Sequence, residues 1–381
     1  MAGLPTVPGV YREERADLPP PALPTGVPVF LGYAADGPVG VPAPVRRPAD
    51  LAAAFGTPAR GYLATAVAAF FRNGGDRCYV IRLDDDAPAT TALAEGLAAA
   101  ADAGEADLVC APDVVRPRVA PGQPDLPPDP GEVAAMQRAL VDHCDRIGTR
   151  IALLDPLPAA TPAAVLEQAA GLRHVNAALY YPWPAEDSGW VPPCGHVAGI
   201  VSRVDRTRGV HHAPANVVLE GVRDVERAID DVTQATLRAG RVNCLRAFPA
   251  RGVRVWDAVT LSREAEWEQL NVRRLVTTLA RWIAQTTRDV AFEPNTPETW
   301  ERVRRAVTAH LDELYRLGAL AGASPDEAYA VDCDERTNPP QARAAGRLAV
   351  DVRVAPAAPI EVIAVRIVRH VAGVTVEPVT D

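Results

Sequence analysis

The chain has 381 residues, of which 48% are hydrophobic and 23% charged, and its net charge is −9. This composition is that of a globular protein with a sizeable core, and the length suggests two to three domain-sized units or one large core. The acidic balance, without any basic block, argues against nucleic-acid binding because phosphate contacts dominate that affinity. No run approaches the 18 apolar residues of a membrane span, so direct membrane insertion is not expected.

The first 26 residues are predicted to form an N-terminal arm. Six prolines between positions 5 and 24 exclude a helix. Between them, Val10, Tyr11 and Arg12 lie in a segment that can form one short strand. A single strand is not stable alone, so this one must fold back onto its own sheet or add to the sheet of another chain.

Residues 27–205 alternate short apolar segments with amphipathic ones, which predicts an α/β half with a largely parallel sheet. Strands are expected at 29–33, 78–83, 107–111, 151–155 and 177–181, and helices at 51–56, 62–72, 91–103, 131–147 and 196–204. The proline-rich residues 112–130 are expected to form a long exposed loop. The six cysteines are widely spread and contain no CxxC pair, so we expect reduced, mostly buried thiols.

Residues 206–370 differ in pattern and predict an α+β core with mixed sheets flanked by helices. Strands are expected at 242–248, 253–256, 290–293, 328–333, 347–354 and 360–368, and helices at 264–287 and 296–317. Thr296 and Pro297 suit the cap and the first turn of the second helix. Residues 371–381, with Val374 and Val376 in an extended piece, are predicted to be a C-terminal arm.

Common catalytic signatures are missing from the sequence: it contains no GxSxG, HExxH, P-loop or GxGxxG motif. Cys194, His196, His211 and His212 suggest a metal site only weakly, because zinc sites usually show two closely spaced pairs of ligands. We therefore expect no catalytic residue, no metal and no cofactor. The alternative is an α/β enzyme or ligand-binding module that uses residues 177–215, with His196, His211 or His212 as its catalytic residue.

Several stretches in collinear order resemble the tail sheath family of contractile phages and phage-like injection particles. They cover roughly residues 7–370 and include 8–14 (PGVYREE), 61–67 (GYLATAV), 70–82 (FFRNGGDRCYVIR), 178–183 (ALYYPW), 191–199 (VPPCGHVAG), 205–210 (DRTRGV), 213–216 (APAN), 251–261 (RGVRVWDAVTL), 271–274 (NVRR), 292–295 (FEPN) and 318–322 (GALAG). Only residues 84–106 separate Leu83 from the next strand, so the resemblance implies a compact sheath without the large insertion of bigger phage sheaths.

The resemblance implies a structural subunit rather than an enzyme. Such subunits assemble in the bacterial cytoplasm as hexameric rings stacked around an inner tube, between baseplate and cap proteins, and they contract once to drive the tube through a target envelope. Their terminal arms add strands to the sheets of adjacent subunits, which here implicates Val10, Tyr11, Arg12, Val374 and Val376. A minor sheath paralogue at the baseplate or cap end is the alternative within the family.

Arginines of the C-terminal half are candidates for charge contacts with the tube or with neighbouring subunits. They are Arg273, Arg274, Arg302, Arg304 and Arg305. A solvated helix surface is the alternative for such side chains, because exposed ion pairs contribute little.

Overall fold

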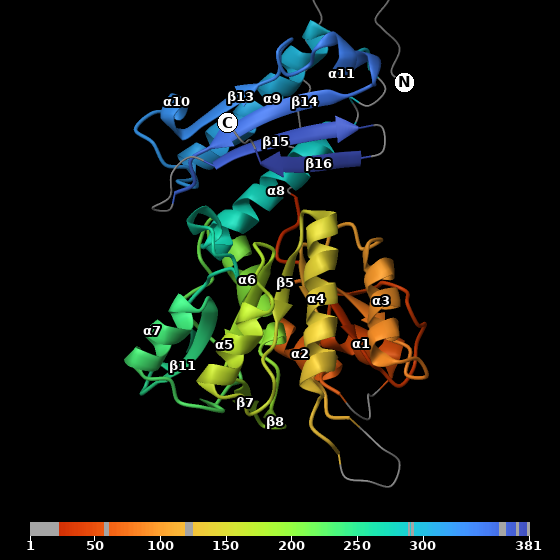
Figure 1. Cartoon of the computed structure of the whole chain (residues 1–381), viewed down its shortest axis with the longest axis vertical. Coiled ribbons are helices and arrows are strands. Elements are labelled where there is room, and N and C mark those ends of the chain that lie inside the picture. The colour runs from red at the N-terminus through yellow and green to blue at the C-terminus, as the bar shows by residue number, and fades with distance from the viewer. Residues whose placement is uncertain are drawn as a thin grey trace, which may run out of the picture.

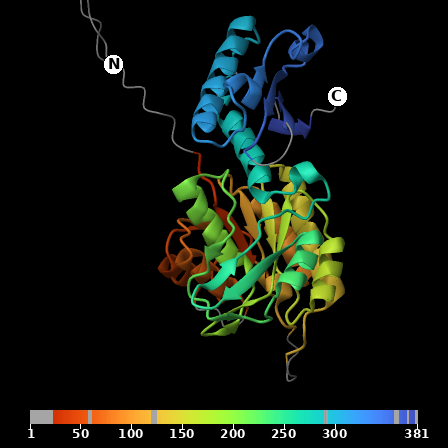
Figure 2. The ribbon, with the colours of Figure 1, turned by 90° about the vertical axis from the view of Figure 1, so that its left-hand side faces the viewer.

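Two bodies of different architecture are joined by one long helix, α8 (Leu270–Thr286) (Figure 1). The computed structural model describes residues 23–56, 61–118, 125–288, 290, 293–357, 363–370 and 373–378. Figure 2 shows the two bodies end to end along the long axis, with α8 reaching from the larger body into the smaller one. The fold is a mixed α/β arrangement, as the sequence predicts.

The larger body is built on a nine-stranded sheet in the order β2-β3-β1-β4-β5-β6-β11-β12-β9. The strands from β3 to β11 in this order are parallel to their neighbours, and the outer strands are antiparallel. Their bounds are β1 (Pro28–Gly32), β2 (Ala43–Val45), β3 (Cys78–Arg82), β4 (Leu108–Cys110), β5 (Ile151–Leu154), β6 (Ala177–Tyr181), β9 (Val217–Val218), β11 (Val242–Phe248) and β12 (Gly252–Val255).

Helices cover both faces of this sheet and enclose two apolar cores. Val29 and Leu31 of β1 point into one core, and Phe30 points into the other, as the period of two in a strand requires. The helices are α1 (Pro48–Phe55), α2 (Leu63–Arg72), α3 (Ala89–Ala100), α4 (Pro130–Ile147), α5 (Pro162–Ala170), α6 (Cys194–Arg208) and α7 (Asp231–Ala239). Burial on both faces explains why the strands read as continuous apolar runs.

The sequence did not reveal several short elements. Helices α5 and α7, whose N-caps are Thr161 and Asp230, were not predicted because each of them buries few residues. A small sheet of β7 (Pro184–Glu186), β8 (Gly189–Trp190) and β10 (Asp224–Val225) also forms, at positions where no strand was predicted. The predicted exposed loop at 112–130 begins instead with a buried 3-10 helix, η1 (Pro112–Val115).

The smaller body is a four-stranded antiparallel sheet in the order β13-β14-β15-β16, packed against α8 and α9 (Figure 1). Val350, Val352 and Val354 alternate along β14 and join the core under these helices. The elements are α9 (Pro297–Arg316), α10 (Pro325–Ala328), β13 (Tyr329–Asp332), α11 (Pro340–Ala344), β14 (Leu348–Val354), β15 (Ile363–His370) and β16 (Gly373–Pro378). The strand expected at 290–293 lies largely outside the described residues.

The division of the chain differs from the predicted one at residue 205. Strands β11 and β12 belong to the same sheet as β6, so the larger body continues to about residue 261. The helix expected at 264–287 begins only at Leu270, after a short 3-10 helix, η2 (Ala265–Trp267). The change of sequence pattern at 206 does not mark a new body, because β9, β11 and β12 all lie in the same sheet as β6.

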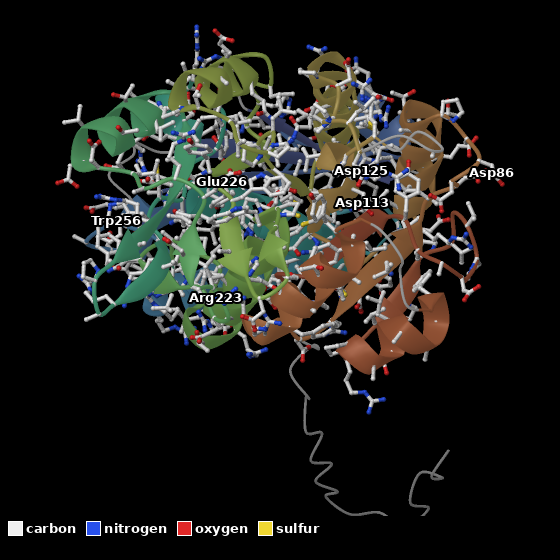
Figure 3. All side chains as sticks on the ribbon, turned by 90° about the horizontal axis from the view of Figure 1, so that it is seen from below. Asp86, Asp113, Asp125, Arg223, Glu226 and Trp256 are labelled. Carbon is white, nitrogen blue, oxygen red and sulfur yellow. The ribbon has the colours of Figure 1, made fainter. Side chains whose placement is uncertain are left out.

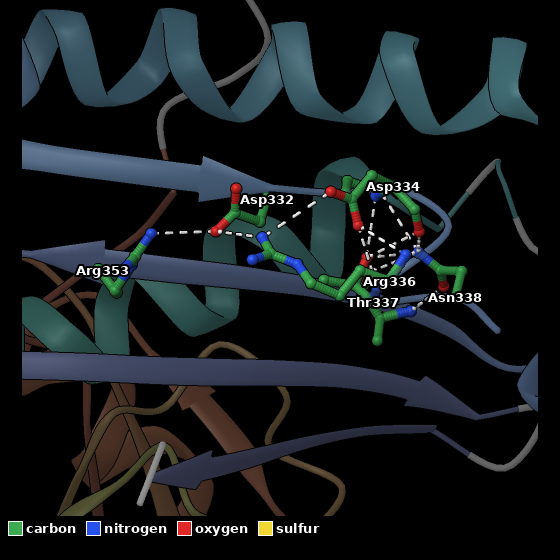
Figure 4. A network of polar contacts seen from close by, with 8 residues as sticks. Asp332, Asp334, Arg336, Thr337, Asn338 and Arg353 are labelled. Atoms are coloured by element: carbon green, nitrogen blue, oxygen red, sulfur yellow. Dashed lines mark hydrogen bonds and ion pairs between the residues drawn. The ribbon is translucent and has the colours of Figure 1, made fainter. Parts of the chain in front are cut away.

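A buried asparagine ties the turn after β13 to the start of β14 (Figure 4). Asn338 is fully buried, accepts a hydrogen bond from Ala349 N at 2.7 Å and donates one to Ala349 O at 3.0 Å. Asp334 Oδ1 accepts hydrogen bonds from Arg336 N and Thr337 N and so shapes the turn. The Asn338 side chain thus makes the two hydrogen bonds to Ala349 that a residue of a neighbouring strand would otherwise make.

Asn338→Ala is expected to destabilise the protein by roughly 1–3 kcal/mol, because it leaves the buried Ala349 backbone groups without their partner. Urea unfolding of the variant measures this loss. Gln341→Ala, at an exposed position of α11, is the matched control and should leave the unfolding midpoint unchanged. Equal midpoints for both variants would mean that the asparagine contributes nothing.

Candidate functional site: the junction between the two bodies

A buried arginine on α8 forms the centre of the junction. Arg274 is 2% exposed, and its guanidinium donates to both carboxylate oxygens of Asp205 at 2.7 and 2.6 Å. The same guanidinium donates to Asp107 Oδ2 at 3.0 Å. Burial by itself would lower the pKa of Arg274. The carboxylates of Asp205 and Asp107 outweigh burial and raise this pKa above its usual value. The charge is therefore permanent and fully paired.

Asp107 links this arginine to the beginning of the described chain. Its carboxylate accepts hydrogen bonds from Gly26 N at 3.0 Å and from Val27 N at 2.7 Å. These residues lead directly into β1, and Asp107 itself precedes β4. One carboxylate thus fixes the entry of the chain, the centre of the large sheet and the connecting helix together.

A cavity of about 760 Å³ opens beside this network, between α8 and the amino-terminal edge of the sheet. Arg281 of α8 lines it, donates to Glu105 O at 2.8 Å and lies 3.7 Å from Asp107 Oδ2. Leu23 and Pro24, the first residues described, line the same cavity. The chain therefore emerges from the predicted arm directly at the joint between the two bodies.

Two of the five arginines predicted to contact the tube or a neighbour face inward instead. Arg274 is buried in the network described above, and the prediction is wrong for it. Arg273 donates to Asn176 Oδ1 at 2.8 Å and lies 5.0 Å from the Trp267 ring, so its partners are also internal. Burial lowers the pKa of Arg273 to about 10. Both side chains hold α8 on the larger body.

The other three arginines lie on the surface of α9. Arg302, Arg304 and Arg305 have side chains that are 54%, 44% and 70% exposed. They pair within the chain, Arg302 with Glu293 and the other two with Glu301. A contact with a tube or a neighbour stays a prediction for these three residues.

The histidines of the alternative hypothesis do not converge on one site. His196 is fully buried in α6, with Nε2 3.0 Å from Glu186 Oε1, and Arg72 Nη1 lies 3.0 Å from the same oxygen. Burial raises the pKa of Glu186, but His196 and Arg72 outweigh burial and leave it below its usual value. His211 and His212 pair with each other instead, with ring centroids 4.3 Å apart.

Metal-ligating and thiol chemistry find no support in the residues that the structure describes. Within them, no group of three or more His, Cys, Asp or Glu side chains could hold a metal ion. All six cysteines are free and buried, as expected, and burial raises the pKa of Cys244 and of Cys333 to about 12. Such thiols are not activated as nucleophiles. Over the same described residues, the helices are too short or too polar to cross a membrane.

One buried carboxyl group makes stability depend on pH. Asp155 follows β5 and accepts a hydrogen bond from Cys194 N at 2.8 Å, at the start of α6. Burial raises the pKa of Asp155 to about 7 from an ordinary value of 3.8. The folded state therefore holds this proton while the unfolded state releases it, so stability falls as pH rises from about 4 to about 7.

The difference between these two pKa values corresponds to about 4 kcal/mol at and above pH 7. Asp155→Asn keeps the acceptor for Cys194 N and removes the titration, so its advantage over the original chain should grow from pH 4 to pH 7. Urea unfolding at three pH values tests this. Asp187→Asn, at a side chain that is 96% exposed, serves as the control, and parallel curves for Asp155→Asn and the original chain would contradict the prediction.

The two predicted strand-adding segments differ in what the structure shows. Val10, Tyr11 and Arg12 lie outside the described residues. Val374 and Val376 lie in β16, which pairs with β15 of the same chain, opposite Arg369 and Ile367. β16 is the outermost strand of its sheet. Strand addition to a neighbour thus stays a prediction, and for β16 it requires exchange of the strand or use of its outer edge.

Family models match most of the two bodies just described. The model for the phage tail sheath protein central domain matches residues 125–261, and that for the phage tail sheath C-terminal domain matches residues 262–369. The chain belongs to the tail sheath protein family. The end of the first match coincides with the end of the large sheet, before α8.

Known relatives agree with this assignment. The tail sheath protein of Vibrio phage KVP40 is 24% identical over 221 residues, which are 57% of this chain and 31% of that protein. The chain thus spans about a third of the length of the curated relatives it matches. The helical sheath of the anti-feeding prophage in its contracted state is 30% identical, with a TM-score of 0.75 over 94% of this chain and 98% of that one. The contracted PVC sheath complex of an extracellular contractile injection system is 27% identical, with a TM-score of 0.72 over 94% and 96%.

Proposed function

We propose that this chain is the structural subunit of a contractile sheath that polymerises around an inner tube and drives the tube through a target envelope. The observation that carries the proposal is the match to the anti-feeding prophage sheath, which covers nearly the whole of both chains. The role we infer is structural and not enzymatic.

Self-association is the main interaction of such a subunit, in hexameric rings stacked around the tube. An inner tube protein, a baseplate and a cap are its further partners, in a phage tail or phage-like particle assembled in the bacterial cytoplasm. The terminal segments join subunits by strand addition, with Val10 to Arg12 at one end and Val374 and Val376 at the other. The main-chain hydrogen bonds of these added strands then keep neighbouring subunits joined while the packing between them changes.

Contraction in this proposal is a two-state repacking of rigid bodies. The buried pairs around Arg274 keep each subunit intact, so the change falls on contacts between subunits and on their terminal segments. No nucleotide is needed, because the assembled lattice stores the free energy.

Electron microscopy of the chain, purified together with its tube protein, tests the proposal. Striated tubes around the inner tube, shorter and wider after a contraction trigger, are expected. A strictly monomeric chain under every condition, with or without the tube, would rule the proposal out.

A minor sheath paralogue at the baseplate end is the second candidate. It is favoured by one observation, a TM-score of 0.76 at 30% identity to a chain of the anti-feeding prophage baseplate assembly. Labelling of the subunit in intact particles separates the two, because the main sheath is labelled along its whole length and a minor one only at an end.

A further inference from the structure

An exposed hairpin tip on the larger body carries an arginine, Arg251, beside one ring of an aromatic pair, and Arg246 lies over both rings of that pair. The β11–β12 turn at residues 249–252 is exposed, and the rings of Phe248 and Trp256 at its base lie 4.6 Å apart. The guanidinium of Arg251 lies 5.6 Å from the Phe248 ring. Within the described part of the chain, no carboxylate lies within ion-pair distance of it. Arginine beside aromatic rings is the composition of interface hot spots.

A cavity with an excess of acidic groups lies on the other side of the same body. Its volume is about 750 Å³, and five carboxyl groups line it against two guanidinium groups. It lies at the carboxyl ends of β1 and β4, where the chain leaves Tyr33 and Asp113. Asp85, 47% exposed, lies at its edge.

One arginine of the same chain already lies in this cavity, against an aromatic ring and a carboxylate. The guanidinium of Arg116 lies 3.3 Å from the centre of the Tyr33 ring, and its Nη1 is 3.6 Å from Asp85 Oδ1. An aromatic face and a carboxylate thus form one arginine site, and the remaining carboxyl groups, among them Asp129 and Glu132, leave the cavity net acidic. The lining therefore complements a further guanidinium in charge.

The hairpin tip and the acidic cavity lie at the same level of the body and on opposite sides. Strands β3 and β11 run in the same direction in one sheet, with β1, β4, β5 and β6 between them. The turns that follow them therefore leave the same edge of the sheet. Figure 3, seen from below, shows Trp256 at the left side and the cavity residues Asp113 and Asp125 to the right of the centre.

We propose that the Arg251 hairpin of one subunit docks on the acidic cavity beside Glu132 of a second copy of this chain. Because the two surfaces differ and lie apart, the contact is head-to-tail, and such contacts close into rings or continue as a helix. The inference rests on the proposed sheath function and names the surfaces that build its lattice.

A charge exchange tests the contact. Arg251→Glu and Glu132→Arg each place like charges together, so each should raise the protein concentration needed for sheath assembly on the tube by about tenfold or more. The chain that carries both substitutions places opposite charges together again and should assemble at close to the original concentration. Arg206→Glu, at an exposed site on α6, is the matched control and should have no effect.

The outcomes separate this inference from the proposed function. If the original chain assembles and Arg251→Glu assembles equally well, the contact does not exist and the sheath function stands. If both single variants fail and the double variant also fails while thermal unfolding is unchanged, the pairing of these two surfaces is wrong. Failure of the original chain to assemble overturns both.

Discussion

Arg274→Met is expected to lower the free energy of unfolding by about 3–5 kcal/mol. The substitution keeps most of the side-chain volume but leaves the carboxylate of Asp205 buried without its cation, while Asp107 keeps only Arg281, at 3.7 Å. An unpaired buried charge costs more than the lost attraction alone, because no water can replace the partner. Urea unfolding of the monomeric subunit measures the loss.

Two matched variants show whether the position or the charge matters. Arg304→Met removes an arginine from the exposed surface of α9 and should leave unfolding unchanged within error. Arg274→Lys keeps the charge but cannot bond both oxygens of Asp205, so it should fall between the original chain and Arg274→Met. An effect of Arg274→Met no larger than that of Arg304→Met would contradict the role of the network.

The elements of the parallel sheet were predictable because their strands are buried on both faces. Segments such as 78–83 and 151–155 are apolar except for Arg82 and Asp155, and the structure places β3 and β5 there. The order of the strands was not predictable. The pairing of β11 with β6 joins residues about 60 apart in the sequence, and no local pattern encodes it.

The junction was missed although the sequence holds a signal for it. Arg274 follows Leu270 by four residues and precedes Leu275, so it lies on the apolar face of the helix. A charge on that face needs a buried partner, and Asp107 directly before an apolar strand was one candidate. The adjacent arginines Arg273 and Arg274 suggest a basic surface, but the helical period places Arg274 on the buried side.

The exposed arginines of α9 show a different limit of prediction from sequence. They lie on the exposed surface of α9, with Val303, Val307 and Leu311 buried on the other face. Whether such a surface meets a tube depends on a second chain, which no period or motif within one chain describes. Assembly contacts are therefore the part of the function that sequence patterns constrain least.

Deletion of residues 1–14 is expected to abolish sheath assembly and to leave the subunit folded. The hydrogen bonds that anchor the chain begin at Gly26 and Val27, on Asp107, so the deletion removes none of them. Thermal unfolding should shift by less than about 2 °C. Electron microscopy with the tube protein should show bare tubes, because the strand that would pair with a neighbouring sheet is gone.

A variant of full length shows whether a strand, rather than length alone, is what assembly needs. Replacing Val10 and Tyr11 together by proline removes two backbone donors and prevents pairing without shortening the chain. Replacing them by threonine and phenylalanine keeps strand propensity and serves as the control. If the proline variant forms sheaths as readily as the control, the N-terminal segment does not act as an added strand. If only the control assembles, main-chain pairing at Val10 and Tyr11 is what joins the subunits.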